Sequence, residues 1–247
     1  MFPTFLRCSA VWLGMTLAAH VQAGVVINTT RVIYPAADKE VSFVVQNSGT
    51  AEILAQSWLE ADADSGLGES LPFAITPGLA KMAGNARQLI RIIYAGEGMP
   101  ADRESVLWLN VQEIPQSGNE NELQIAIRQR IKMFYRPQGL NGDPLKAAEG
   151  LQWQVRDGQL EVSNPGAYHV SMIKLDVRQQ GATLFQTDSR MLAPRQRLRF
   201  PLKQGVAREP VELSFISIND FGAQEAYRAL VSGEPAAQAE KVEARRE

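Results

Sequence analysis

Cysteine and histidine are nearly absent from this chain of 247 residues, and their scarcity excludes several kinds of site. The one cysteine is Cys8, and the two histidines are His20 and His169. A zinc site needs clustered cysteine and histidine ligands, and a disulfide framework needs paired cysteines. We therefore expect no cofactor, no metal site and no disulfide in the folded protein.

Apolar runs long enough to cross a membrane are also lacking. A shorter run near the N-terminus has the pattern of a secretory signal peptide. Arg7 precedes an apolar run over 8–19, and a small-residue cleavage pattern then ends at Ala23. A membrane anchor would need about 20 apolar residues, and this run is shorter. A lipoprotein is disfavoured because Cys8 opens the apolar run instead of closing it. We expect residues 1–23 to be removed on export, with no membrane insertion of the mature chain.

Neither sign of charge dominates the exported chain. Removal of residues 1–23 takes away Arg7 and no acidic residue, so that 24 basic and 27 acidic side chains remain. This near-neutral balance disfavours nucleic acid or a polyanionic surface as the main partner. The remaining length is enough for one large or two ordinary domains, each with a core that needs no covalent cross-links.

A convincing helical periodicity is missing as well. Short alternating segments separated by Gly, Pro, Asn and Asp are typical of an all-β sandwich or barrel. The pattern breaks over 136–144 and restarts with a predicted hairpin turn at Asp157-Gly158. We expect one domain over 24–140 and a second over 141–233, with 234–247 as a disordered tail because it has no apolar periodicity. The expected strands include 41–47, 53–61, 87–95, 105–115, 123–135, 168–180, 196–202, 211–219 and 224–232.

The segment 123–136 differs from the other strand candidates in length and in the chemistry of its two faces. Successive side chains of a strand point to opposite faces, so that one face here is mostly apolar and the other mostly basic. An ordinary edge strand, with its apolar row on the core and its charges in water, also explains the pattern. The length favours a further role, because a usual strand has about five or six residues and a longer one can extend beyond its own sheet.

Several motifs, in the same order along the chain, resemble the periplasmic pilus-assembly chaperones of the PapD type. They are TRVIYP (30–35), DRESVLWLNVQEIP (102–115), LQIAIRQRIKMFYRP (123–137), SNPGAYHVSMIKL (163–175) and SIND-FG (217–222). The resemblance implies two immunoglobulin-like β-sandwich domains in a boomerang arrangement with a cleft between them. It also implies a chaperone that binds and stabilises pilin subunits by donor-strand complementation and delivers them to an outer-membrane usher.

The resemblance assigns roles to eight residues. Arg31 and Lys132 would bind the C-terminal carboxylate of the subunit. The hydrophobic row of the donor strand would consist of Leu123, Ile125 and Ile127, and an ionic cluster between the domains would consist of Glu104, Arg136 and Asp220. The connection QSGNENE (116–122), without flanking cysteines, resembles the short-loop subclass. A long exposed apolar strand also favours a self-capping dimer of the free protein.

Three features depart from the family pattern. Pro77-Gly78 stands where relatives often have Pro-Pro, and Ala167 stands where they often have proline. A disulfide seen in the second domain of some members cannot form here. These departures concern loop geometry and leave the predicted binding residues unchanged.

Other functions fit the sequence less well. A Ser-His-Asp enzyme would depend on His169, but no nucleophile-elbow sequence is present, so we expect a surface or strand-packing histidine and no enzyme. A sugar-binding adhesin could use Trp58, Trp108 and Trp153, but their strand positions favour core packing. A pilin is a single incomplete sandwich, which conflicts with the length and the two-domain layout of this chain.

Overall fold

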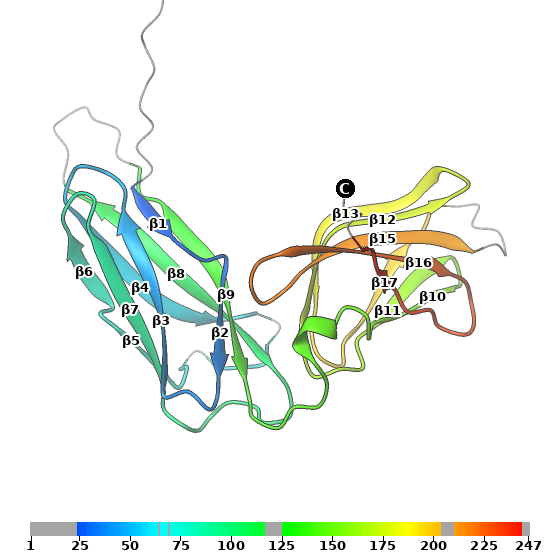
Figure 1. Cartoon of the computed structure of the whole chain (residues 1–247), viewed down its shortest axis with the longest axis horizontal. Helices are drawn as coiled ribbons and strands as arrows, with labels where there is room; N and C mark the ends of the chain where they lie inside the picture. The colour runs from blue at the N-terminus through cyan, green and yellow to red at the C-terminus, as the bar shows by residue number, and fades with distance from the viewer. Residues whose placement is uncertain (1–23, 64, 69, 117–124, 204–209, 244–247) are drawn as a thin grey trace, which may run out of the picture.

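The computed structural model describes residues 24–63, 65–68, 70–116, 125–203 and 210–243. The predicted signal peptide 1–23 and the predicted donor residue Leu123 lie outside the described residues. The described chain forms two bodies of β-strands inclined to each other (Figure 1), joined by a connection that contains the short 3-10 helix η1 (Pro144–Lys146). Within these residues, no helix has the length and apolar character needed to cross a bilayer.

The first domain is a sandwich of two sheets, with strand orders β1-β3-β7-β5 and β2-β9-β8-β4-β6. Neighbouring strands are antiparallel except β2 and β9, which are parallel. The chain changes sheets between β1 and β2, because β1 pairs with β3 and β2 pairs with β9. The strands are β1 (Val25–Ile27), β2 (Arg31–Pro35), β3 (Glu40–Asn47), β4 (Ile53–Ala61), β5 (Phe73–Thr76), β6 (Leu79–Met82), β7 (Arg87–Tyr94), β8 (Ser105–Pro115) and β9 (Arg128–Arg136).

Alternation along the strands produces the core of the first domain. In β8, Leu107, Leu109 and Val111 are fully buried, whereas the intervening Trp108 is only partly buried on the opposite face. Each fully buried aliphatic side chain stabilises the fold by about 1.5–3 kcal/mol. An aromatic group at one end of this core, Tyr34, Phe73, Tyr94 and Tyr135, packs with ring centroids 4.8 to 6.4 Å apart.

The second domain is also a sandwich, with strand orders β10-β11-β14 and β13-β12-β15-β16-β17. Its core centres on Trp153 and Phe215, whose rings lie 5.5 Å apart, and Tyr227 stacks on Phe215 at 5.2 Å. The strands are β10 (Gln152–Arg156), β11 (Gln159–Ser163), β12 (Val170–Gln179), β13 (Ala182–Leu192), β14 (Arg197–Pro201), β15 (Val211–Ile218), β16 (Gln224–Val231) and β17 (Glu240–Lys241).

A buried asparagine performs the same task in each domain. The side-chain amide of Asn47 donates to the carbonyls of Ala51, Met82 and Ala83, and its oxygen accepts from the amide of Gly49. The corresponding bonds of Asn164 go to Tyr168, Leu192, Ala193 and Gly166. A buried amide must be fully hydrogen-bonded, and the equal patterns indicate that one sandwich design is used twice.

The predicted strands are found, and the one that differs most is 123–135. The hairpin turn is present, since Asp157 and Gly158 both have the positive φ that such a turn requires (51° and 73°). Strand β9 begins only at Arg128, and one further bond, from the amide of Glu113 to the carbonyl of Ile127 at 3.0 Å, continues the pairing. The same register would place Ile125 opposite Pro115, which has no amide hydrogen to donate. Strand β13 was not predicted, because its pattern mixes polar and apolar residues without strict alternation.

The prediction of a disordered tail from residue 234 is wrong for residues 234–243. Ala237 exchanges two backbone hydrogen bonds with Trp153, and β17 pairs with β16. Ala239 is buried in the core of the second domain. Small alanine side chains fit against Trp153 without any apolar periodicity, which is why the sequence pattern gave no signal. Residues 244–247 lie outside the described residues.

Candidate functional site

Arg31 and Lys132 lie opposite each other, although 101 positions separate them in the sequence. Arg31 begins β2, Lys132 lies within β9, and the parallel pairing of the two strands sets them in register. Residues in register on neighbouring strands share a sheet face. That face is turned to the second domain, because the Nη1 of Arg31 donates to the carbonyl of Ile218 at 2.9 Å. The two predicted anchor residues are therefore brought together between the domains.

Both cations are partly buried, and one donor of Arg31 is unpaired. Burial lowers the pKa of Lys132, the nearby charge of Arg31 lowers it further, and Asp62 opposes the change. Burial also lowers the pKa of Arg31, which Asp220 and Glu104 oppose. The Nε of Arg31 is buried and has no hydrogen-bond partner. A buried cation with an unused donor is costly, and an anion bound there would relieve that cost.

The basic face of β9 continues away from this pair over two partly buried tryptophans. The guanidinium carbon of Arg130 lies 4.1 Å from the Trp108 ring centroid, and that of Arg128 lies 4.9 Å from the Trp58 centroid. Trp58 and Trp108 are only partly buried and face the outside of the sheet. The prediction that they pack in the core is therefore wrong for these two and right for Trp153. Strand alternation alone shows that two side chains lie on the same face of a strand, but it cannot show whether that face packs against the core.

Among the described residues, the N-terminal half of β9 pairs with a neighbouring strand on one side only. β8 pairs with β9 from Arg128, whereas β2 pairs with it only from Lys132 onward. The preceding residues continue the same alternating row, and Ile125 and Ile127 are 68% and 45% exposed. Met133, further along that row, is fully buried. The row is thus part of the core in one half of the strand and exposed beside an open sheet edge in the other.

Glu104, Arg136 and Asp220 form one ionic cluster between the domains. Arg136 donates from Nε and Nη2 to Glu104 Oε2 at 2.9 and 2.6 Å, and from Nη1 and Nη2 to Asp220 at 2.7 and 3.1 Å. Burial alone would lower the pKa of Arg136, but hydrogen bonds from the guanidinium to the two carboxylates and their charges raise it overall. Glu104 comes from the first domain and Asp220 from the second, so that Arg136 joins the two.

His169 is a further member of this cluster that the sequence did not reveal. Its Nδ1 and its backbone nitrogen both lie 2.9 Å from Glu104 Oε1, and its side chain is 5% exposed. The amide of Glu104 donates in turn to the carbonyl of Ala167 at 2.9 Å. Every oxygen of the Glu104 carboxylate is therefore paired. The histidine was expected at the surface or in strand packing, because its position opposite Glu104 depends on how the two domains meet.

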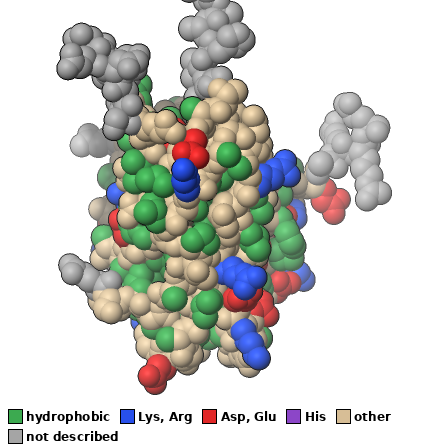
Figure 2. All heavy atoms as spheres, turned by 90° about the vertical axis from the view of Figure 1, so that its left-hand side faces the viewer, with side chains coloured by type: hydrophobic (Ala, Val, Ile, Leu, Met, Phe, Trp, Pro, Cys, Tyr) green, Lys and Arg blue, Asp and Glu red, His purple; other side chains and the backbone are tan. Residues whose placement is uncertain are grey.

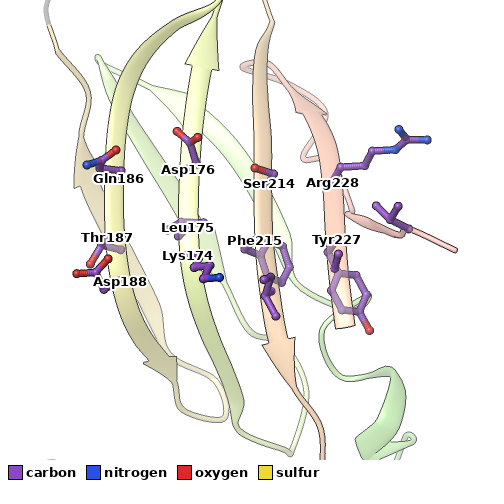
Figure 3. A pocket seen from close by; sticks show the side chains of 13 residues that line it. Lys174, Leu175, Asp176, Gln186, Thr187, Asp188, Ser214, Phe215, Tyr227 and Arg228 are labelled. Carbon is purple, nitrogen blue, oxygen red and sulfur yellow. The ribbon is translucent and has the colours of Figure 1, made fainter. Parts of the chain in front are cut away.

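Two hollows formed by described residues contain neither Arg31 nor Lys132. A cavity of about 430 Å³ between the domains is lined by Asp62, Glu104 and His169 from the first and second domains together with residues 193–196. A shallow hollow of about 510 Å³ on β13, β12, β15 and β16 is lined by Lys174, Asp176 and Asp188 (Figure 3), and none of the predicted site residues reaches it. The end of the first domain that faces away from the second shows hydrophobic side chains dispersed among polar and charged ones (Figure 2).

Comparison with known proteins accounts for both domains. The family model for the pili and flagellar-assembly chaperone PapD N-terminal domain matches residues 24–141, and that for the pili assembly chaperone PapD C-terminal domain matches 146–229. Chaperone protein FimB/FhaD of Bordetella pertussis is 39% identical over 228 residues, which cover 88% of this chain and 92% of that protein.

Solved structures agree with the same assignment. The crystal structure of the YadV chaperone, known from Escherichia coli (strain K12), has a TM-score of 0.71 at 35% identity and covers 84% of this chain and 99% of its own. The periplasmic chaperone SfaE has a TM-score of 0.66 at 34% identity and covers 85% of this chain and 100% of its own.

These matches confirm the all-β prediction of two immunoglobulin-like domains. They also confirm the predicted class of function, because both family models describe chaperones and neither describes an enzyme. The chain therefore belongs to the PapD family of periplasmic pilus-assembly chaperones, which bind pilin subunits.

Proposed function

We propose that this chain holds a pilin subunit by donor-strand complementation and binds the C-terminal carboxylate of that subunit at Arg31 and Lys132. The donor row consists of Leu123, Ile125 and Ile127, of which the latter two are exposed beside the open edge of β9. A subunit that lacks a strand has an apolar groove and unpaired backbone groups, and a supplied strand covers both.

One observation carries the proposal: Arg31 begins β2 where the open edge of β9 ends. A strand added along that edge, parallel to β9, would run head to tail into β2. Its terminal carboxylate would then meet the guanidinium of Arg31 and the ammonium of Lys132. Charge-assisted bonds of this kind contribute about 1.5–3 kcal/mol each.

The donor row would supply much of the holding strength and the anchor would fix the register. Burial of an aliphatic side chain contributes about 1.5–3 kcal/mol before ordering costs are subtracted. A slip of one residue would turn every side chain to the wrong face, and a fixed chain end prevents that slip.

Other parts of the prediction belong to the same proposal. We propose that residues 1–23 are removed on export, that the domains span 24–140 and 141–233, and that residues 234–243 complete the second domain. The subunit would be delivered to an outer-membrane usher. We also propose the short-loop subclass, on the seven residues QSGNENE (116–122) of the sequence, and a self-capping dimer of the free protein, which the exposed row of Ile125 and Ile127 supports.

Co-expression with a pilin subunit from the same gene cluster tests this function. We expect a soluble one-to-one complex with the wild type, and loss of most of the recovered subunit with Arg31→Ala, Lys132→Ala or Ile127→Asp. Lys39→Ala and Leu230→Ala serve as controls, because Lys39 is an exposed cation and Leu230 an exposed aliphatic residue outside the proposed site. Undiminished recovery with both anchor variants would refute the carboxylate anchor.

A further inference from the structure

Phe221 is the most exposed large hydrophobic side chain of the described residues, at 84% exposure. It lies in the loop between β15 and β16, which reaches from the second domain toward the first (Figure 1). A single exposed apolar residue is ordinary on a protein surface. The surroundings of Phe221 are not ordinary, because its loop is rigid and is fixed against the predicted anchor.

The loop is held by one asparagine. The side-chain oxygen of Asn219 accepts from the amides of Phe221 and Ala223, each at 3.0 Å. The carbonyl of Asn219 accepts from the amide of Gly222 at 2.9 Å, and its side-chain nitrogen donates to Glu225 at 3.1 Å. The backbone that carries Phe221 is therefore set before any partner arrives, which lowers the entropy cost of a contact made by its ring.

Both neighbours of Phe221 contact the first domain. Asp220 is paired with Arg136 at 2.7 Å. Gly222 has a φ of +79° and lies so close to Thr30 that a Cβ there would be 2.6 Å from the threonine oxygen. Thr30 immediately precedes Arg31. The loop thus docks on the residue next to the anchor and leaves the phenylalanine ring exposed.

We propose that Phe221 contacts an apolar side chain among the last few residues of the bound subunit, so that the second domain takes part in subunit selection. The inference rests on the proposed carboxylate anchor. Ile218, whose carbonyl accepts from Arg31, is three residues from Phe221, so that their Cα atoms are at most about 11 Å apart. A subunit strand rises about 3.3 Å per residue, and its last few residues span that distance.

A double-mutant cycle between the chaperone and the subunit tests the contact. The probe is a pilin subunit from the same gene cluster, co-expressed with each chaperone variant. The apolar side chain nearest the subunit's C-terminus is changed to alanine in one arm. Phe221→Ala, Phe221→Trp and the control Leu230→Ala are compared by competition for the subunit against the tagged wild-type chaperone.

We expect Phe221→Ala to lower subunit retention on the order of tenfold, as truncation of an aromatic anchor at an interface does. Phe221→Trp should retain most of the binding, and Leu230→Ala should have no effect. The subunit change should weaken binding to the wild type but not to Phe221→Ala. Because the ring is exposed, Phe221→Ala should melt like the wild type.

Two results would overturn the inference. One is retention by Phe221→Ala equal to that of the wild type, and the other is full additivity of the chaperone and subunit changes. A subunit without an apolar side chain among its last four residues would also contradict it. A failure of the proposed carboxylate anchor can be told apart from a failure of this inference. If the anchor proposal is wrong, Arg31→Ala retains the subunit like the wild type, whatever the result for Phe221→Ala.

Discussion

Arg31 and Lys132 are in-register partners of a parallel strand pair, and they lie where the open edge of β9 ends. Two partly desolvated cations held close together raise the free energy of the protein when no anion is bound to them. The same arrangement favours an anion strongly, since one carboxylate relieves the mutual repulsion and fills the unused donor of Arg31.

Small anions should stabilise the free protein through this pair. We expect sulfate to raise the melting temperature more than chloride at equal ionic strength, because a site that binds only the folded state shifts the unfolding equilibrium. The specific part of the shift should disappear in Arg31→Ala and in Lys132→Ala. Lys39→Ala should keep it, since Lys39 is an exposed cation outside the pair. Thermal unfolding measures the sulfate effect in the wild type and the three variants. Equal shifts in all four proteins would speak against an anion site.

Subunit binding should weaken at alkaline pH through Lys132. Its pKa is lowered by burial and by Arg31, so that its charge is lost at a lower pH than in an ordinary lysine. Retention of the subunit should fall as the pH rises through that lowered pKa. Lys132→Arg should extend retention to higher pH, because arginine stays protonated. Identical pH profiles for the two proteins would exclude Lys132 as the titrating group.

The stability of the free protein, unlike its binding of the subunit, should increase as the pH rises. A lysine whose folded pKa lies below its unfolded pKa destabilises the fold while it is charged, and the cost falls as the pH rises from the folded to the unfolded pKa. Lys132→Met should therefore raise the melting temperature near neutral pH, and this gain should shrink in alkaline solution. Melting curves over a pH series give the measurement.

His169 should contribute to the docking of the two domains. His169→Ala removes one of the two donors to Glu104 Oε1 and leaves a buried carboxylate short of a partner. The expected loss is about 1–3 kcal/mol in the free energy of unfolding. His169→Asn should lose less, because its amide can still donate. Asp102→Ala is the matched control, since Asp102 pairs with Arg195 across the domains in an exposed position. Denaturant unfolding with equal losses in His169→Ala and Asp102→Ala would contradict this role.

Removal of residues 234–247 should destabilise the second domain. The deletion takes away the buried Ala239, strand β17 and two backbone hydrogen bonds to Trp153. We expect a loss of at least about 2 kcal/mol, because each buried backbone group left without a partner costs about 1–3 kcal/mol. The shorter deletion of residues 244–247 is the control and should melt like the full chain. A long deletion without effect on thermal unfolding would show that this segment is dispensable.

The sequence by itself determined most strands and the family, because strand alternation and ordered motifs are local properties of the chain. It also named the residues of the ionic cluster by motif position. Strand alternation could not decide which face of β8 and β4 is covered, and so Trp58 and Trp108 were misplaced. The packed segment 234–243 was missed for a similar reason, since alanines carry no periodic signal.

Only the tertiary structure decided which distant residues meet. The register between β2 and β9 sets Arg31 opposite Lys132, and the angle between the domains sets His169 on Glu104 and the Phe221 loop on Thr30. These meetings depend on strand pairing and domain docking over separations of up to 192 residues, with Thr30 and Gly222 as the longest case. A local pattern holds no information about such pairings, because they follow from the sum of contacts across the whole fold.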